Sequence, residues 1–557
     1  MSNPSKLPDA ALRSWRDLLG SARVLDDAPT LNAFALSTSS WSTLPLAVLR
    51  PNTVEEVSEV VEIAGTHCIA LYPISTGKNW GYGDACAVTN GQVIVDLGGM
   101  HDIEVNATLA YAVIGPGVTQ QELSQYLLDH DIPLWMDCTG AGPDTSLIGN
   151  ILERGFGHSP YGNRFQNVAG MQIVLASGEV LNTGFGHFPG AKATHLFPYG
   201  LGPYLDGLFT QSNLGIVTQL GLWLMPKTAC INHFLCMVEQ HADIAPVVDA
   251  LRPLRLDGTL RSILHIGNDL RVISGGHVYP RDRAGDQGPL PEHIRQELRA
   301  EAGVGAWTVS GALYGSDAQV AIARRALKAA LKPTRAKPQF LSERKLAMGA
   351  VAARMLGRWP LGKRIGAKVE LGKALFEMNR GVPNGRFLAG AYWRRRAGLP
   401  ANFPFHANPA LDNCGMLWVS PILPLCGVDL LRLHALVEPI FQQHGFDLFV
   451  TFSMINERTL GGVITIAYDK ENLPEVARAR VCYHQLFDAI MSAGYIPYRV
   501  GLQSMADLSR AGDVYWRVVG KIKSALDPSD IIAPGRYQPE RAAREPLMSD
   551  QPPSPPI

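Results

Sequence analysis

The segment from Pro73 to Gly83 has the composition of an anion-binding loop. It reads Pro-Ile-Ser-Thr-Gly-Lys-Asn-Trp-Gly-Tyr-Gly and directly follows a predicted buried strand at 69–73. Its glycines let backbone N–H groups turn inward with no Cβ in the way, and its hydroxyl and amide side chains add donors. The glycines are Gly77, Gly81 and Gly83, and the polar donors are Ser75, Thr76 and Asn79. The segment predicts a pyrophosphate-binding loop, with an ordinary glycine-rich turn as the alternative.

Two further loops can present bare backbone to the same ligand. Gly115-Pro-Gly-Val-Thr119 opens a predicted amphipathic helix at 119–131, and a second glycine-containing stretch lies at 145–155. We call the segments 73–83, 115–119 and 145–155 the glycine loops. The first of them has neither the GxGxxG nor the GxxxxGK[ST] pattern, which disfavours a Rossmann or P-loop nucleotide site.

Composition limits the classes of function. The chain has 557 residues, of which 46% are hydrophobic and 18% charged, enough for the cores of two or more compact units. Its 50 Lys and Arg balance 50 Asp and Glu, so no strong positive field is available to bind nucleic acid. The 8 cysteines form no CxxC pair or metal-binding spacing, so we expect buried thiols and no metal site.

The expected location follows from the absence of targeting signals. Residues 1–15 lack a cationic start, an apolar run and a cleavage site. No stretch of the sequence approaches the roughly 20 uninterrupted apolar residues of a membrane span. We expect a cytoplasmic protein without a membrane partner.

Secondary-structure patterns place the glycine loops in an α+β unit. Short strands are predicted at 93–97, 111–114, 173–176 and 180–181. Beyond Pro226, helix-like runs precede a helix, strand, strand, helix succession with the ranges 430–445, 449–452, 463–467 and 476–493. A final amphipathic helix at 515–526 ends at Asp527-Pro528, and a proline-rich tail follows. These patterns predict two unlike units.

Together these motifs resemble the vanillyl-alcohol oxidase and 4-cresol dehydrogenase family of flavoproteins. The resemblance is dense over 50–227 and 415–536 and looser between these ranges. Beyond the glycine loops, it is carried by Gly170-Met171, Val174–Gly178, the run from Phe197 to Ile216, Trp223–Pro226, Gly494–Arg499 and Asp527–Gly535.

The resemblance implies an α+β, two-domain FAD-binding fold of the p-cresol methylhydroxylase type, with an α/β cap domain over the flavin ring. The expected parts are an N-terminal arm (1–45), the FAD-binding domain (46–227), the cap or substrate domain (228–500), a C-terminal segment returning to the FAD domain (501–540) and a disordered tail (541–557). It also makes a homodimer plausible.

The family pattern implies a set of cofactor contacts. In this family the loop at 73–79 holds the FAD pyrophosphate, the other glycine loops cradle the remaining cofactor, and 527–535 closes over it. The positions carried over as cofactor-binding are Pro73, Ser75, Thr76, Gly77, Lys78, Asn79, Gly117, Gly149, Asn150, Gly155, Gly215, Ile216 and Arg536.

The family pattern also implies a phenol site. Tyr82, Tyr498 and Arg499 match positions that bind the phenolic oxygen of the substrate. Trp418 matches an aromatic residue that lines the substrate pocket, and Thr451 is expected there too. The alternatives are a surface dipeptide for Tyr498-Arg499 and a core tryptophan for Trp418.

The chain departs from the family at two features. Many relatives tether FAD through a histidine or a tyrosine, but Met416 occupies the histidine position, 408–415 has no tyrosine and the first 50 residues have no histidine. We therefore expect non-covalent FAD. Relatives also place an acid beside the flavin N5, and its usual positions here are Gly140 and Thr451. Asp137 and Asp144 flank Gly140 and are our candidates for the base, with a turn or capping role as the alternative.

The resulting hypothesis is an FAD-dependent oxidase or dehydrogenase. It would remove hydride from the benzylic carbon of a para-substituted phenol through a quinone methide, giving alcohol, aldehyde or ketone in aromatic catabolism. Oxygen or an electron-carrier protein would reoxidise the flavin. One alternative is the same fold acting on a non-phenolic alcohol, and another is a flavin-binding protein without turnover.

Overall fold

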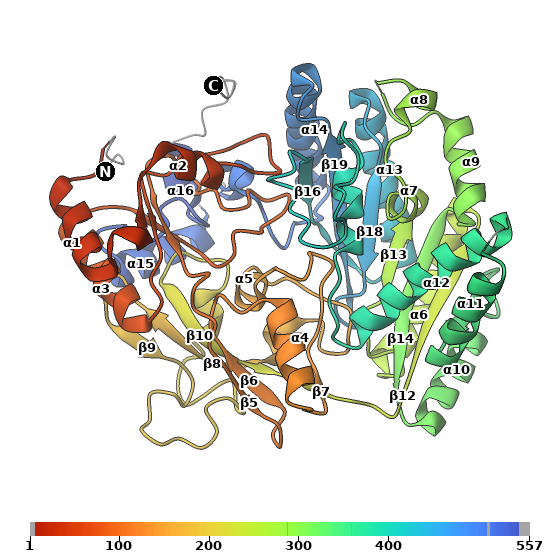
Figure 1. Ribbon diagram of the computed structural model, residues 1–557, viewed down its shortest axis with the longest axis horizontal. Helices are drawn as coiled ribbons and strands as arrows, with labels where there is room; N and C mark the ends of the chain where they lie inside the picture. Colours follow the sequence, from red (N-terminus) through yellow and green to blue (C-terminus); the bar gives the residue numbers. More distant parts are fainter. Residues whose placement is uncertain (1–5, 287, 358, 510–512, 545–557) are drawn as a thin grey trace.

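Two unlike sets of sheets make up the protein (Figure 1). The computed structural model describes residues 6–286, 288–357, 359–509 and 513–544. The first half of the chain forms a four-stranded, a five-stranded and a two-stranded sheet, and an eight-stranded sheet begins after residue 227. The mixed helix and sheet architecture that we expected from the sequence is confirmed.

The four-stranded sheet carries the first glycine loop. Its strands lie in the order β1 (Val24–Leu25), β2 (Val48–Leu49), β4 (Val93–Asp96) and β3 (Leu71–Ile74). Strands β2, β4 and β3 are parallel, and they are buried, as parallel strands usually are. The loop therefore leaves the carboxyl end of a buried parallel strand. The helices of this region are α1 (Asp9–Leu19), α2 (Ala28–Phe34) and α3 (Val54–Thr66).

The antiparallel five-stranded sheet carries the other two glycine loops. Its order is β5 (Ile103–Asn106), β6 (Tyr111–Ile114), β10 (Ile216–Trp223), β8 (Val168–Val174) and β9 (Val180–Asn182). Strands β7 (Leu134–Trp135) and β11 (Met225–Pro226) form the small sheet. Helix α4 (Gln120–Asp129) begins at a capping box between Thr119 and Glu122, and α5 (Leu147–Leu152) begins at Ser146.

The eight-stranded sheet is antiparallel throughout. Its strands are β15 (Lys337–Leu341), β12 (Cys230–Val238), β14 (Trp307–Gly315), β13 (His265–Asn268), β18 (Phe449–Ser453), β19 (Thr459–Tyr468) and β16 (Gly415–Val419), with β17 (Ile422–Pro424) also on β19. The helices are α6 (Ile244–Leu256), α7 (Asp269–Ile273), α8 (Arg281–Ala284), α9 (Glu292–Ala302), α10 (Asp317–Leu331), α11 (Glu343–Met355), α12 (Pro360–Asn379), α13 (Gly427–His444) and α14 (Leu473–Ser492).

The two faces of this sheet differ in chemistry. One face packs apolar side chains such as Val309 and Phe452 against α6, α10, α13 and α14, and it is fully buried. Because side chains alternate along a strand, residues paired across strands share a face. The register therefore collects the remaining side chains on the opposite face, which we call the polar face. It includes His233, His265, Ser310, Trp418, Thr451, Ser453 and Thr465.

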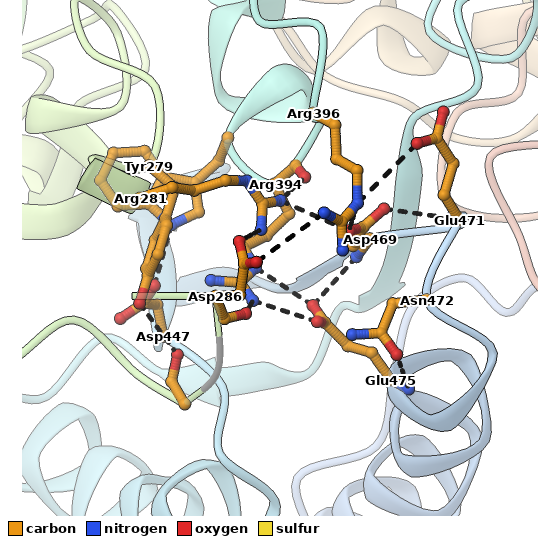
Figure 2. A network of polar contacts seen from close by, with 12 residues as sticks. Tyr279, Arg281, Asp286, Arg394, Arg396, Asp447, Asp469, Glu471, Asn472 and Glu475 are labelled. Atoms are coloured by element: carbon orange, nitrogen blue, oxygen red, sulfur yellow. Dashed lines mark hydrogen bonds and ion pairs between the residues drawn. The ribbon is translucent and has the colours of Figure 1, made fainter. Parts of the chain in front are cut away.

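Ion pairs fix the segment that follows the short helix η5 (Arg386–Tyr392) (Figure 2). Arg394 forms a buried double hydrogen bond with Glu475, at 3.1 and 3.0 Å. Arg396 Nε lies 2.7 Å from Asp469 Oδ2. Breaking a buried pair of this kind costs about 3–5 kcal/mol, because it leaves an uncompensated charge. The network therefore ties residues 394–396 to the end of β19 and the start of α14.

The end of the chain packs on the first half of the molecule. Helix α15 (Val514–Leu526) precedes a loop in which Ile532 bridges to Leu71 of β3. The buried Lys523 Nζ donates to Asn213 O and Ile532 O, each at 2.8 Å. The sequence analysis expected a disordered tail over 541–557. Residues 541–544 belong instead to the helix α16 (Pro539–Arg544), and 545–557 lie outside the described residues. Within the described ranges, no helix has the length and apolar character to cross a bilayer.

Candidate active site

The first glycine loop presents free backbone donors. Within the described part of the chain, the N–H groups of residues 75–79 donate to no protein acceptor, and these residues are partly exposed. Gly77 has a φ of +64°, and a Cβ there would lie 3.0 Å from the Ala85 Cβ. A run of inward N–H groups next to a glycine in the left-handed region is typical of an anion-binding nest.

The other glycine loops close around the first. Ser146 N donates to Thr76 Oγ1 at 3.2 Å, and Ser146 Oγ donates to Pro116 O at 2.7 Å. A Cβ at Gly149 would collide with Ser75 Oγ. Lys78 Nζ donates to the backbone oxygen of Asp144 at 2.9 Å. The three segments that the sequence analysis singled out are therefore adjacent in space.

We expect Gly77→Val to lose bound cofactor. Valine at a φ of +64° is strained, and its side chain would press on Ala85 beside the free N–H groups. The expected result is at least about a tenfold loss of cofactor affinity, read as the flavin-to-protein absorbance ratio after purification.

Gly258→Val is the matched control, because Gly258 has a φ of +76° with open space around it. It imposes similar backbone strain at an unrelated site. Full flavin occupancy in Gly77→Val, or equal losses in both variants, would show that this loop does not carry the cofactor affinity.

The remaining predicted cofactor residues occupy different settings. Asn150 Oδ1 accepts a hydrogen bond from Arg164 Nη1 at 3.0 Å, and Gly155 packs on the Asn150 side chain. Gly215 packs against β8, and Ile216 is buried at the start of β10. Arg536 lies after α15. The other positions belong to the glycine loops: Pro73, Ser75, Thr76, Lys78, Asn79, Gly117 and Gly149.

The predicted phenol-binding residues come together. The Arg499 guanidinium lies over the Tyr82 ring, 4.3 Å from its centroid. Tyr82 Oη and Ser420 Oγ are 2.5 Å apart, and the Trp418 ring stands edge-on to Tyr82 at 5.5 Å. Burial raises the pKa of Tyr82 well above its usual value and also raises the pKa of Tyr498, whose shift Arg499 opposes. Both phenols therefore remain neutral hydrogen-bond donors near pH 7.

Glu153 organises the charges of this cluster. Arg499 Nε lies 3.2 Å from Glu153 Oε2, Arg536 also pairs with this carboxylate, and Tyr537 Oη donates to it at 3.1 Å. Arg499 additionally donates to Asn79 Oδ1 of the first glycine loop. Two guanidiniums thus share one carboxylate, which leaves a net charge of about +1 in a largely buried site. Such a site favours an anionic ligand.

The two candidate bases are held away from this cluster. Asp137 Oδ2 accepts from the buried Arg164 Nε at 2.8 Å, and Asp137 Oδ1 accepts from the N–H groups of His158 and Ser159 at 3.1 and 2.8 Å. Asp144 is partly exposed and lies 3.5 Å from His406 Nδ1. The structure gives neither carboxylate a contact with the phenol-binding residues, and the base role stays a prediction.

Comparison with known proteins identifies the family. A family model described as an FAD binding domain matches residues 45–184. The chain is 37% identical to a 1'-carboxy-chondrochloren decarboxylase of Chondromyces crocatus, over 95% of this chain and 97% of the relative. It is 31% identical to the 4-cresol dehydrogenase (hydroxylating) flavoprotein subunit of Pseudomonas putida, over 94% of each. The chain belongs to the vanillyl-alcohol oxidase and 4-cresol dehydrogenase family of flavoproteins.

Solved structures of this family share the whole fold. A p-cresol methylhydroxylase with bound substrate superposes with a TM-score of 0.83 at 30% identity, covering 95% of this chain and 96% of the other. A 4-ethylphenol oxidase from Gulosibacter chungangensis, in complex with isoeugenol, gives 0.85 at 28% identity, covering 96% and 98%. The resemblance noted in the sequence is confirmed, and the protein is an FAD-dependent oxidoreductase of this family.

The residues present fit the FAD of this family. The free N–H groups of 75–79 and the close approach of the other glycine loops supply a cradle for a pyrophosphate, with no Cβ at Gly77 or Gly149 to fill it. Lys78, anchored on Asp144 O, adds a positive charge at the same loop. FAD is the cofactor, as the sequence analysis expected.

Sequence reasoning missed three residues that position the flavoprotein's candidate substrate site. Ser420 could have been found, because it follows Trp418 by two residues and so extends the same strand face. Gln211 Nε2 donates to Tyr498 O at 2.8 Å and to Glu153 O at 3.3 Å. No local pattern marks Gln211 or the role of Glu153, because Tyr498, Arg499 and Arg536 lie far away along the chain.

Proposed function

We propose that this enzyme oxidises para-substituted phenols at the benzylic carbon, binding them as phenolates between Tyr82, Tyr498 and Arg499. The observation that carries the proposal is the cluster of neutral phenolic donors and an arginine with a net positive charge. Relatives named for 4-cresol and 4-ethylphenol support the substrate class.

The energetics of phenolate binding agree with the residues present. A free phenol has a pKa of about 10, and bringing it to about 7 needs roughly 4 kcal/mol of preferential stabilisation of the anion. A hydrogen bond to a charged group contributes about 1.5–3 kcal/mol. Three donors therefore suffice, whereas a single donor would not.

Ionisation of the substrate prepares the redox step. Bound FAD supplies the hydride acceptor. A phenolate loses hydride from its benzylic carbon more easily than a neutral phenol does, because its oxygen donates charge to the ring as the quinone methide forms. The quinone methide then adds water, which gives an alcohol. When the substrate is already a benzylic alcohol, the quinone methide instead loses its hydroxyl proton, which gives an aldehyde or ketone. Oxygen or an electron-carrier protein completes the cycle.

Carboxylated phenols are a further substrate class to test. A relative that covers nearly the whole chain is named a decarboxylase of a carboxy compound. The same phenolate site serves such a substrate, provided that the cap also accommodates its carboxylate.

We infer that FAD is bound non-covalently. Met416, on β16 of the polar face, takes the family's histidine position, and its thioether has no N–H or O–H proton to lose in forming a neutral tether of the histidine or tyrosine kind. Acid precipitation is therefore expected to release the yellow colour into the supernatant. Flavin fluorescence that stays with the washed, denatured pellet would mean that another residue tethers the cofactor.

Anaerobic titration tests the proposed function. We expect 4-hydroxybenzyl alcohol to bleach the flavin absorbance of the purified enzyme, whereas benzyl alcohol, its matched non-phenolic control, leaves it unchanged. Bleaching by non-phenolic alcohols alone would replace the proposal with an alcohol oxidoreductase. A yellow protein that no alcohol bleaches would indicate flavin binding without turnover.

A further inference from the structure

Arg271 is a partly buried arginine that has no acidic partner among the described residues. It lies on α7, directly after β13. Among the described residues it forms no ion pair, and its side chain makes one hydrogen bond, from Nη2 to Phe387 O at 3.5 Å. Burial lowers its pKa, and no carboxylate opposes this effect. An unpaired guanidinium held partly out of water favours an anionic ligand, since charged hydrogen bonds are stronger there than in bulk water.

Arg271 lies over the polar face beside Thr451. A Cβ placed on Gly267 would be 3.7 Å from Arg271 Cγ, so the arginine stem covers Gly267. Gly267 pairs directly with Thr451 across β13 and β18, which puts their side-chain positions on the same face. The guanidinium is therefore on the side of the sheet that also carries Trp418.

Both positions where the family pattern led us to expect an acid lie next to neighbours of Arg271, and neither is acidic. Thr451 adjoins its stem, and Gly140 adjoins its hydrogen-bond partner, since a Cβ on Gly140 would lie 3.1 Å from Phe387 Cβ. Two acids of this region already have partners, because Asp137 pairs with Arg164 and Asp269, on the same helix α7, pairs with Arg295. The positive charge of Arg271 is thus left without a counter-ion from the residues that the structure describes.

Two neutral histidines line the same region. The rings of His158 and His265 are 4.2 Å apart, and His158 also meets the Phe387 ring at 6.1 Å. Burial lowers the pKa of His158 to about 3 and that of His265 well below its usual value. These imidazoles offer hydrogen bonds but no negative charge. They therefore complete a polar site without neutralising the arginine.

The distance between this region and the phenol cluster suits one extended substrate. Trp418 belongs to β16 and His265 to β13, and β19 and β18 lie between these strands (Figure 1). Three strand spacings of about 4.8 Å give roughly 14 Å. Phe156 lies between the two ends of this span. Its ring centroid is 5.9 Å from that of Tyr498, and in the sequence it comes two residues before His158.

We propose that Arg271 binds a carboxylate carried on the para side chain of the substrate, at the end opposite the phenolic oxygen. His158 and His265 add hydrogen bonds to this anionic group. The inference rests on the proposed phenol site, and it narrows the substrate class to phenols with a carboxylated side chain.

Two inert phenols test this inference by binding alone. In (3-(4-hydroxyphenoxy)propoxy)acetate and the matching acetamide an ether oxygen replaces the benzylic carbon, so neither has a hydride to lose there. Both are long enough when extended to span the roughly 14 Å between β16 and β13. They differ in charge and little in shape. We expect the acetate to bind the FAD-loaded enzyme roughly 10–100-fold more tightly than the amide, as measured by calorimetry and by the change in flavin absorbance.

Arg271→Gln is expected to abolish this preference while leaving the FAD content and the affinity for the amide unchanged. Arg271→Lys should retain part of the preference, because it keeps the charge. Arg325→Gln is the matched control and should keep all of it, since Arg325 is exposed on α10, which covers the opposite face.

Equal affinities of the wild-type enzyme for acetate and amide would overturn this inference alone, whether or not the variants fold. A preference that survives in Arg271→Gln would also overturn it. If neither compound nor 4-ethoxyphenol binds, the proposed phenol site fails and the inference fails with it.

Discussion

Replacing Arg499 by alanine is expected to slow flavin reduction by 4-ethylphenol roughly 10–150-fold. The guanidinium lies over Tyr82 and supplies the unbalanced positive charge of the cluster, so its removal leaves one carboxylate facing one guanidinium. Losing a charged hydrogen bond to the phenolate removes about 1.5–3 kcal/mol. The rate of anaerobic reduction, followed by stopped-flow absorbance at saturating substrate, measures the effect.

Tyr498→Phe gives a smaller, matched test of the same site. It removes one hydroxyl donor and keeps the ring, and the expected loss is about tenfold. Both variants should keep their FAD and should lose the red-shifted absorbance of a bound, inert para-substituted phenolate. Unchanged reduction rates in both would contradict the phenolate site and favour a non-phenolic alcohol as substrate.

Glu153→Gln is expected to destabilise the protein by about 3–5 kcal/mol. The substitution keeps the shape of the side chain but leaves Arg499 and Arg536 close together without a shared anion. Removing one partner of a buried ion pair has a cost of this size, because the remaining charge stays buried. Denaturant unfolding of the apoprotein measures the change in the free energy of unfolding.

The control for this variant is Glu104→Gln, which neutralises an exposed carboxylate on β5. Its effect should stay within about 0.5 kcal/mol. Equal stabilities of Glu153→Gln and the wild type would show that the two guanidiniums do not depend on Glu153.

Local signals in the sequence led to the three glycine loops, which the structure brings together, while the cofactor contacts of their residues stay a prediction. The glycine loops could be found because residues such as Gly77 permit backbone conformations that other residues rarely adopt, and this local effect is visible in the sequence. The helix predicted at 119–131 is observed as α4 at 120–129, where Thr119 and Glu122 form the capping box. Tyr498 and Arg499 were found only through the family pattern.

Contacts between distant segments could not be predicted. Glu153 and Tyr537 are 384 residues apart and yet share a hydrogen bond. The polar face depends on the register of strands whose order in the sheet is not their order in the sequence. Nothing in the sequence therefore indicated that His265 and Thr451 lie on the same face. Arg271 could not be predicted for a different reason. It is distinguished by the lack of an acidic partner among the described residues, which only the three-dimensional structure shows.

The most direct test of the account compares 4-ethylphenol with its methyl ether, 4-ethylanisole, in anaerobic stopped-flow reduction of the wild-type enzyme. The two compounds share the benzylic carbon, but only the phenol can ionise. The account predicts full flavin reduction by 4-ethylphenol, slowed when its benzylic hydrogens are replaced by deuterium, and reduction by the ether at least about 100-fold slower. Equal rates of reduction by the two compounds would contradict it.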